Sequence, residues 1–134
     1  MARRRNQKEH LDAYLRSWPF DPAGISVRLV KGDDDRDVIQ MRVDMGILQL
    51  EARGRPDGTR PQGFETYHDY LIHEAVRVGD EFVLDEDQSN EADREFVQYY
   101  HRRVCWLALC NFAKAVADAD HTLGLMDFCR DHSP

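Results

Sequence analysis

Cysteine and histidine residues near the C-terminus have side chains that could bind a metal ion. Cys105, Cys110 and His121 lie within segment 102–128, and Cys129 follows it directly. Structural zinc sites usually use short-spaced ligand pairs such as C-x-x-C, and this sequence contains no such pair. On one helix Cys105 and Cys110 would diverge by about 140°. We therefore predict free thiols rather than a zinc site.

Two other groups of residues raise the same question of metal binding. His68 and His73 are five residues apart, so on a helix they also diverge by about 140° and do not form an i, i+4 ligand pair. The acidic run at 33–37 suggests a calcium loop, but Val38 stands where such a loop needs glycine and Asp44 where it needs glutamate. The sequence predicts no cofactor.

The segment "RGRPDGTRPQG", residues 53–63, is the most distinctive loop of the chain. Its Pro-Asp-Gly order at residues 56–58 is typical of a tight turn. Arg55 and Arg60 could be presented as a cation pair that clamps a carboxylate or phosphate, so Arg55, Asp57 and Arg60 are the candidate partner-binding residues. The interpretation that we favour is a polar connector between a sheet and a helix.

The periodicity of apolar residues changes along the chain and predicts an α+β fold. Spacings of three and four residues predict an N-terminal helix at 6–17, and alternation then predicts an antiparallel β-meander within 25–52. A single long strand with a glycine bulge is the alternative for the second half of the meander. One face of this sheet is apolar and needs a cover.

Residues 64–134 have helical periodicity. A first helix begins near residue 64 and ends at Gly79, and Asp85 with Gln88 predicts a capping box for a long helix at 86–110. A turn at Asn111 leads into a last helix that starts near Phe112. We expect one domain, 1–134.

Residues 96–128 resemble a tetratricopeptide repeat (TPR), a helical hairpin of 34 residues. The resemblance rests on Tyr99 and Trp106, the Asn-Phe turn, Ala115 and a late leucine pair, whereas Arg102 and Arg103 stand where the family prefers an apolar and a small residue. The resemblance is to a single, degenerate repeat.

The resemblance also implies which residues of the first helix would face a ligand: Val97, Tyr100, Val104, Leu107 and Ala108. Nearly all of them are apolar. We therefore predict that the sheet covers this stripe, through Ile39, Met41, Leu48 or Leu50, and that the hairpin packs on the sheet.

Residues 8–134 are similar to the N-terminal part of bacterial proteins that join such repeats to a UvrB/UvrC-type (UVR) motif, as seen in "VIQMRVDMGILQLEARGRPDG" and "ADREFVQYYHRRVCWLAL". The UVR motif itself has no counterpart here. The resemblance implies the N-terminal part of a longer protein that works through protein contacts, and it supplies no catalytic residue.

Composition limits the remaining classes of function. The formal net charge of −7 argues against a nucleic-acid partner, although residues 3–5 are three arginines. The N-terminus lacks the apolar region of a signal peptide, no stretch could span a membrane, and three unpaired cysteines suit a reducing compartment, so we expect a cytoplasmic protein.

These features together favour a non-catalytic interaction or adaptor module with an unidentified protein partner. The alternatives are a small-ligand binder or enzyme that uses the loop 53–63, and an accessory factor linked to nucleic-acid repair.

Overall fold

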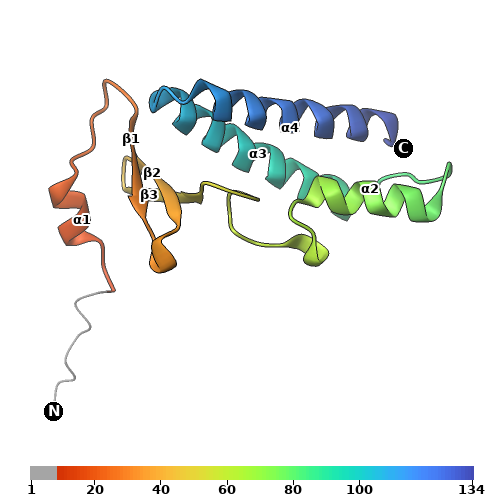
Figure 1. Cartoon of the computed structure of the whole chain (residues 1–134), viewed down its shortest axis with the longest axis horizontal. Coiled ribbons are helices and arrows are strands. Elements are labelled where there is room, and N and C mark those ends of the chain that lie inside the picture. The colour runs from red at the N-terminus through yellow and green to blue at the C-terminus, as the bar shows by residue number, and fades with distance from the viewer. Residues whose placement is uncertain (1–8) are drawn as a thin grey trace, which may run out of the picture.

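The computed structural model describes residues 9–134. The elements follow in the order α1 (Asp12–Ser17), β1 (Ser26–Lys31), the 3₁₀ turn η1 (Asp33–Asp35), β2 (Asp37–Val43), β3 (Gly46–Glu51), the 3₁₀ turn η2 (Pro61–Gly63), α2 (Tyr67–Val78), α3 (Glu86–Ala108) and α4 (Phe112–Asp131). In Figure 1 α3 and α4 run side by side as a long hairpin, with the sheet near the turn that joins them and α2 toward their other ends. The predicted α+β architecture is confirmed.

The three strands form the predicted meander. β1 pairs with β2 and β2 with β3, both antiparallel. Val43 pairs with Gly46 across a turn made of Asp44 and Met45. A tight turn therefore reverses the chain at this point, and the alternative of one long bulged strand is wrong.

The two faces of the sheet are covered by different parts of the chain. Ile39 is fully buried and pairs with Leu50, which is 6% exposed, on the face that packs against the helices. On the other face the Arg42 guanidinium donates to the backbone oxygen of Trp18 at 2.6 Å, and the Arg28 guanidinium lies 4.0 Å from the centroid of the Trp18 ring. The segment after α1 is thus fixed to the outer face by two arginines.

The N-terminal helix is shorter than the predicted 6–17. Residues 6–8 lie outside the described part of the chain, as does the arginine run at 3–5, and α1 begins only at Asp12. None of its residues is buried, and Leu11 and Tyr14 of its apolar stripe stay about half exposed. Short helices depend on packing for stability, and these two residues contribute little of it.

Side-chain caps set where α2 and α3 begin. α2 begins at Tyr67, three residues later than predicted, because the Thr66 hydroxyl accepts a hydrogen bond from the Asp69 N–H at 3.1 Å. α3 begins with the predicted capping box, in which Asp85 accepts from the Gln88 N–H at 2.7 Å and Gln88 accepts from the Asp85 N–H at 2.9 Å.

The turn between α3 and α4 explains why α3 ends at Ala108 rather than at Cys110. Cys110 has φ 58°, in the left-handed region. Its N–H donates to the oxygen of Leu107 at 3.0 Å, and the N–H of Asn111 donates to that of Trp106 at 2.8 Å. This is a Schellman motif, with cysteine at the position that usually holds glycine.

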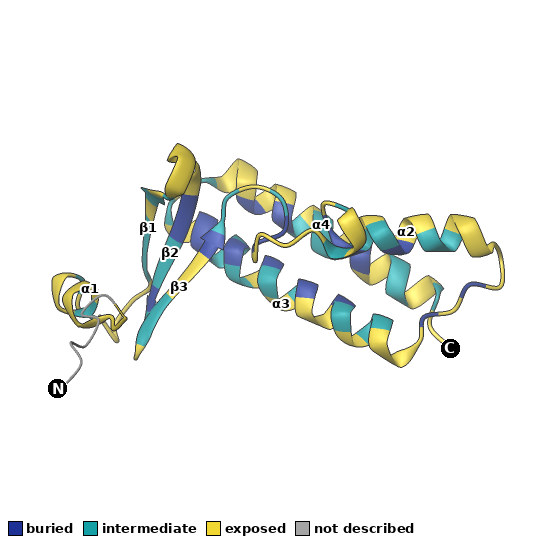
Figure 2. Ribbon diagram, turned by 90° about the horizontal axis from the view of Figure 1, so that it is seen from below, coloured by how far each residue is buried: buried dark blue, intermediate teal, exposed yellow. Residues whose placement is uncertain are grey.

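The interior consists of two apolar clusters joined through a polar region. One cluster lies between α2, α3 and α4, and the other lies between the sheet and the turn end of the hairpin; Figure 2 shows buried residues along the inner sides of these elements. Five charged residues are buried as well: Arg42 on the outer face of the sheet, and Arg55, Glu95, Arg102 and Asp118 in the polar region. On α3, Glu95 and Arg102 lie between the residues that serve the two clusters.

The predicted burial of the stripe on α3 is wrong. Val97, Tyr100 and Leu107 are 54%, 52% and 47% exposed, and the sheet packs instead on Cys105, Trp106 and Ala115. The inner side of α3 carries Tyr99 and Trp106 together with two charged residues, so the apolar stripe falls on the opposite side of the helix. The hairpin does pack on the sheet, but through another face.

Trp106 anchors the cluster under the sheet, where it is 3% exposed. We expect Trp106→Ala to lower the free energy of unfolding by about 3–5 kcal/mol, because the loss of transfer energy is joined by a cavity. Chemical denaturation of both proteins measures this difference. A loss below about 1 kcal/mol would contradict the packing described here.

Candidate functional site

Arg55, in the loop between β3 and α2, points into the protein. Its side chain is 3% exposed and contacts three carboxylates: that of Glu91, that of Asp57 at 3.3 Å and that of Glu95 at 3.0 Å. The contact from Nε to Glu95 is an ion pair without hydrogen-bond alignment. The alternative in which Arg55 and Arg60 are presented together therefore fails for Arg55, whose charge is already matched within the chain, and the loop connects β3 to α2 as in the interpretation that we favour.

Glu95 is the meeting point of four parts of the structure. Its fully buried carboxylate accepts hydrogen bonds from the backbone N–H groups of Tyr67 at 2.7 Å and His68 at 3.1 Å, and it lies 2.9 Å from Nε2 of His121. Tyr67 and His68 are the first residues of α2, where free N–H groups and the helix dipole favour a negative charge. With Arg55, this carboxylate connects the loop, α2, α3 and α4.

Aromatic rings pack around the polar contacts of Glu95. The ring of His121 stacks on Tyr99 with a centroid distance of 3.8 Å, and His68 meets His121 edge-on at 5.5 Å. Burial raises the pKa of Tyr99 to about 12, so its phenol stays protonated at neutral pH. These rings shield the carboxylate from solvent.

A second buried ion pair lies next to this region. Arg102 of α3 contacts Asp118 of α4 through two parallel hydrogen bonds of 2.9 Å each. Its Nη1 also donates to the backbone oxygens of Glu51 at 3.0 Å and Gly54 at 2.8 Å. Arg102 thereby joins the end of β3 and the start of the loop to the helical hairpin.

The buried charge cluster, as we name Arg55, Glu95, Arg102, Asp118 and His121, contains residue types that could act in acid–base chemistry. Its polar atoms, however, contact one another and the backbone, an arrangement that favours a role in positioning the elements. Among residues 9–134 no group of three or more His, Cys, Asp and Glu side chains is arranged to hold a metal ion. Burial raises the pKa of the Cys105 thiol to about 11, so it remains protonated.

The sequence analysis missed this cluster, although the signal was present. Glu95, Tyr99, Arg102 and Trp106 have the spacing i, i+4, i+7, i+11 and so share one face of a helix. Since Tyr99 and Trp106 were expected to be buried, the two charged residues on their face had to be buried too. The departure of Arg102 from the repeat pattern was a second signal.

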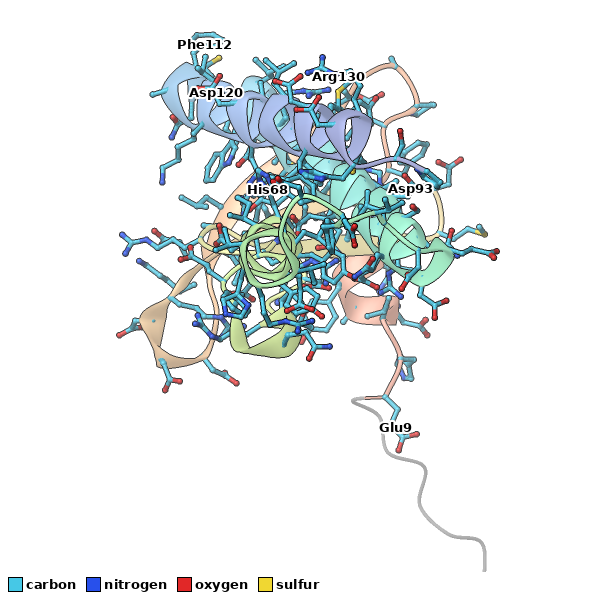
Figure 3. All side chains as sticks on the ribbon, turned by 90° about the vertical axis from the view of Figure 1, so that its right-hand side faces the viewer. Glu9, His68, Asp93, Phe112, Asp120 and Arg130 are labelled. Carbon is cyan, nitrogen blue, oxygen red and sulfur yellow. The ribbon has the colours of Figure 1, made fainter. Side chains whose placement is uncertain are left out.

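The side of the hairpin that faces away from α2 is apolar and exposed. We name it the open helical face; its large residues are Val97, Tyr100 and Leu107 on α3 and Phe112, Val116, Leu123 and Met126 on α4. The four on α4 follow the spacing i, i+4, i+11, i+14 and form one stripe. In Figure 3 Phe112, Asp120 and Arg130 lie along the side of α4 away from α2, and Asp93 lies on the outer side of α3.

The two stripes belong to neighbouring, antiparallel helices. Asp93 lies on α3, four residues before Val97, and is close to Cys129 of α4. Burial raises the pKa of the Cys129 thiol, and the negative charge of Asp93 raises it further. The outer side of α3 thus adjoins α4, and the two apolar stripes lie on neighbouring helices.

A polar cleft lies between the loop 53–63 and two neighbouring residues, Arg36 just before β2 and Glu51 at the end of β3. It is a hollow of about 480 Å³ that is lined by arginines from the turn before β2 and from the loop, notably Arg36, Arg53 and Arg60. We name it the arginine cleft. Asp57, the third candidate residue from the sequence, also lines it and is held by Thr59 and Gln98.

Comparison with known proteins leaves the function open. No protein-family model matches the chain, and no curated protein or solved structure matches it either. The similarity to tetratricopeptide repeats and to UVR-motif proteins therefore stays a prediction. None of the helices in the described residues is long and apolar enough to cross a membrane.

Replacement of Glu95 tests the importance of the buried charge cluster. We expect Glu95→Ala to lower the free energy of unfolding by about 3–5 kcal/mol, because it leaves Arg55 buried next to an empty site. Chemical denaturation measures the change. Glu81→Ala, which removes an exposed carboxylate, is the control and should change stability by less than about 0.5 kcal/mol.

The cluster also predicts how stability depends on pH. Burial alone would raise the pKa of Glu95, but hydrogen bonds from His121 and the α2 amides outweigh it, so this pKa lies below its usual value. The resulting stabilisation is present above the unfolded-state pKa of about 4.3 and is lost as the pH falls through the folded-state pKa.

His68 adds a second loss of stability on acidification, which begins at a higher pH than the loss caused by Glu95. Burial and then the neighbouring His121 lower the pKa of His68, although Asp69 and Glu95 oppose this, so the unfolded chain takes up a proton first. Stability should therefore decrease below about pH 6.5. Denaturation at pH 8, 6, 5 and 4 should show two losses, and His68→Gln should lack the first. An unchanged profile in His68→Gln would contradict this assignment.

Proposed function

We propose that this protein is a non-catalytic interaction module that binds a protein partner through the open helical face. The observation that carries the proposal is the alignment of seven large apolar side chains, each about half exposed, on two adjacent helices. Scattered exposed apolar residues are normal on a monomer, but several hundred Å² of contiguous apolar surface is typical of an interaction site.

The shape of this face favours a helical partner. Two antiparallel helices with parallel apolar stripes leave a groove between them, and a third helix fits such a groove through residues spaced i, i+3/i+4, i+7. Removing several hundred Å² of apolar surface from water at about 25 cal/mol per Å² stabilises a complex by several kcal/mol before the costs of association. The TPR resemblance supports the same mode of contact between helices.

The charges around the groove favour a partner with basic flanks. Asp93, Asp120 and Asp127 are exposed along its rim, and of these Asp127 has a partner, Arg130, at 3.3 Å. The net charge of −7 adds to this field. We therefore propose an amphipathic helix with one apolar stripe and flanking Lys or Arg residues as the occupant, in a cytosolic protein of adaptor type.

Two aspartates in the groove should abolish partner binding without unfolding the protein. We expect Val116→Asp with Leu123→Asp to reduce capture of the partner from a bacterial lysate at least tenfold, because both residues are more than half exposed and line the groove. The protein captured by the wild type is cross-linked, and the contacting segment is synthesised as a peptide. Circular dichroism should show that the peptide becomes helical on binding.

The control places the same substitutions on other exposed apolar residues. Met45→Asp with Val76→Asp, at residues that are 90% and 79% exposed, should leave capture unchanged. Equal capture by the groove variant and the wild type, or a contacting segment that stays non-helical, would refute the proposal.

A further inference from the structure

The cations that line the arginine cleft differ in whether a carboxylate of the chain already neutralises them. Arg36 forms two hydrogen bonds with Glu51, of 2.8 and 3.2 Å. Arg55 is matched by the carboxylates of the buried charge cluster and by Asp57. Within residues 9–134, no carboxylate lies within ion-pair distance of Arg53 or Arg60. Two guanidinium groups that line one hollow thus lack an ion-pair partner, although a hydrogen bond from Lys31 and then the charge of Arg53 help to lower the pKa of Asp37.

The carboxylates of the cleft do not cancel this charge. Glu51 is engaged by Arg36, and Asp57 accepts hydrogen bonds from Thr59 and Gln98 beside Arg55. Glu65 is the remaining carboxylate of the lining. The lining thus holds four arginines and three carboxylates, and Arg53 and Arg60 are the two arginines without an ion pair to any of these carboxylates.

The loop holds these two arginines in place. Arg102 fixes the backbone of Gly54, next to Arg53, through a 2.8 Å hydrogen bond, and Arg60 donates to the backbone oxygen of Gly63 at 3.1 Å. Gly58, at φ 77°, lets the loop pass so close to Glu51 that an added Cβ would lie 3.2 Å from its side chain. The positions of both arginines are thus anchored to the buried charge cluster or to the loop itself.

We propose that the arginine cleft binds a small molecule through an oxyanion group, a phosphate or a carboxylate, held between Arg53 and Arg60. A guanidinium group donates two parallel hydrogen bonds to either oxyanion, and two such groups in one hollow can bind it from both sides. The hollow of about 480 Å³ is larger than a single oxyanion, so it has room for the body of a small metabolite. This site is separate from the open helical face and does not depend on the function proposed for it.

Isothermal titration calorimetry at constant ionic strength tests this proposal, with inorganic phosphate and citrate as the two probes. We expect saturable binding of at least one probe to the wild-type chain. Preference for phosphate would indicate a phosphorylated ligand, and preference for citrate a carboxylate ligand; both support the site. The double variant Arg53→Gln with Arg60→Gln should bind the preferred probe at least tenfold more weakly than the wild type.

The control removes two arginines elsewhere. Arg77→Gln with Arg130→Gln lowers the charge by the same amount at exposed residues of α2 and α4 that do not line the cleft, and it should change affinity less than twofold. Thermal unfolding confirms that each variant is folded. Absence of saturable binding of both probes to the wild type, or equal weakening in the two double variants, would overturn the proposal.

Discussion

The burial of one carboxylate, that of Glu95, constrains the arrangement of most of this structure. A charge with no exposure to water costs several kcal/mol unless donors and opposite charges surround it; here the start of α2 and His121 lie at hydrogen-bond distance, and Arg55 adds a positive charge at 3.0 Å. Since each of these groups belongs to a different element, the elements can satisfy Glu95 only in one mutual arrangement. The arrangement of these elements and the compensation of the Glu95 charge therefore depend on each other.

The polar region between the two apolar clusters also fixes how α3 lies against α4. Arg102 meets Asp118 through two aligned hydrogen bonds, and His121 lies beside Glu95 almost one turn further along α4. Apolar contacts alone tolerate a shift of one helix along another, but such a shift would leave these charges buried and unpaired. We infer that the buried charge cluster selects the register of the hairpin, while the apolar clusters supply most of its stability.

The sequence predicts what depends on neighbours along the chain and fails where distant residues meet. The meander, the capping box at Asp85 and the end of α2 follow from local periodicity and turn chemistry, and the structure confirms them. The roles of Arg55 and Arg102 depend on partners 16 to 51 residues away, which no local pattern specifies. The stripe at Val97 was misplaced because an apolar stripe was assumed to face inward, whereas here charged residues occupy the inner side.

The location of the long-range contacts has a consequence for the order of folding. The strand pairs and the α3–α4 pair, which hold most of the contacts, join segments that are close in sequence, so they can form early and independently. Arg55 and Arg102 join these hairpins through contacts across 36 to 51 residues, so we expect those contacts to form after the hairpins. A chain in which those contacts fail to form would keep its helices and strands but lose their fixed mutual packing, which is the defining property of a molten globule.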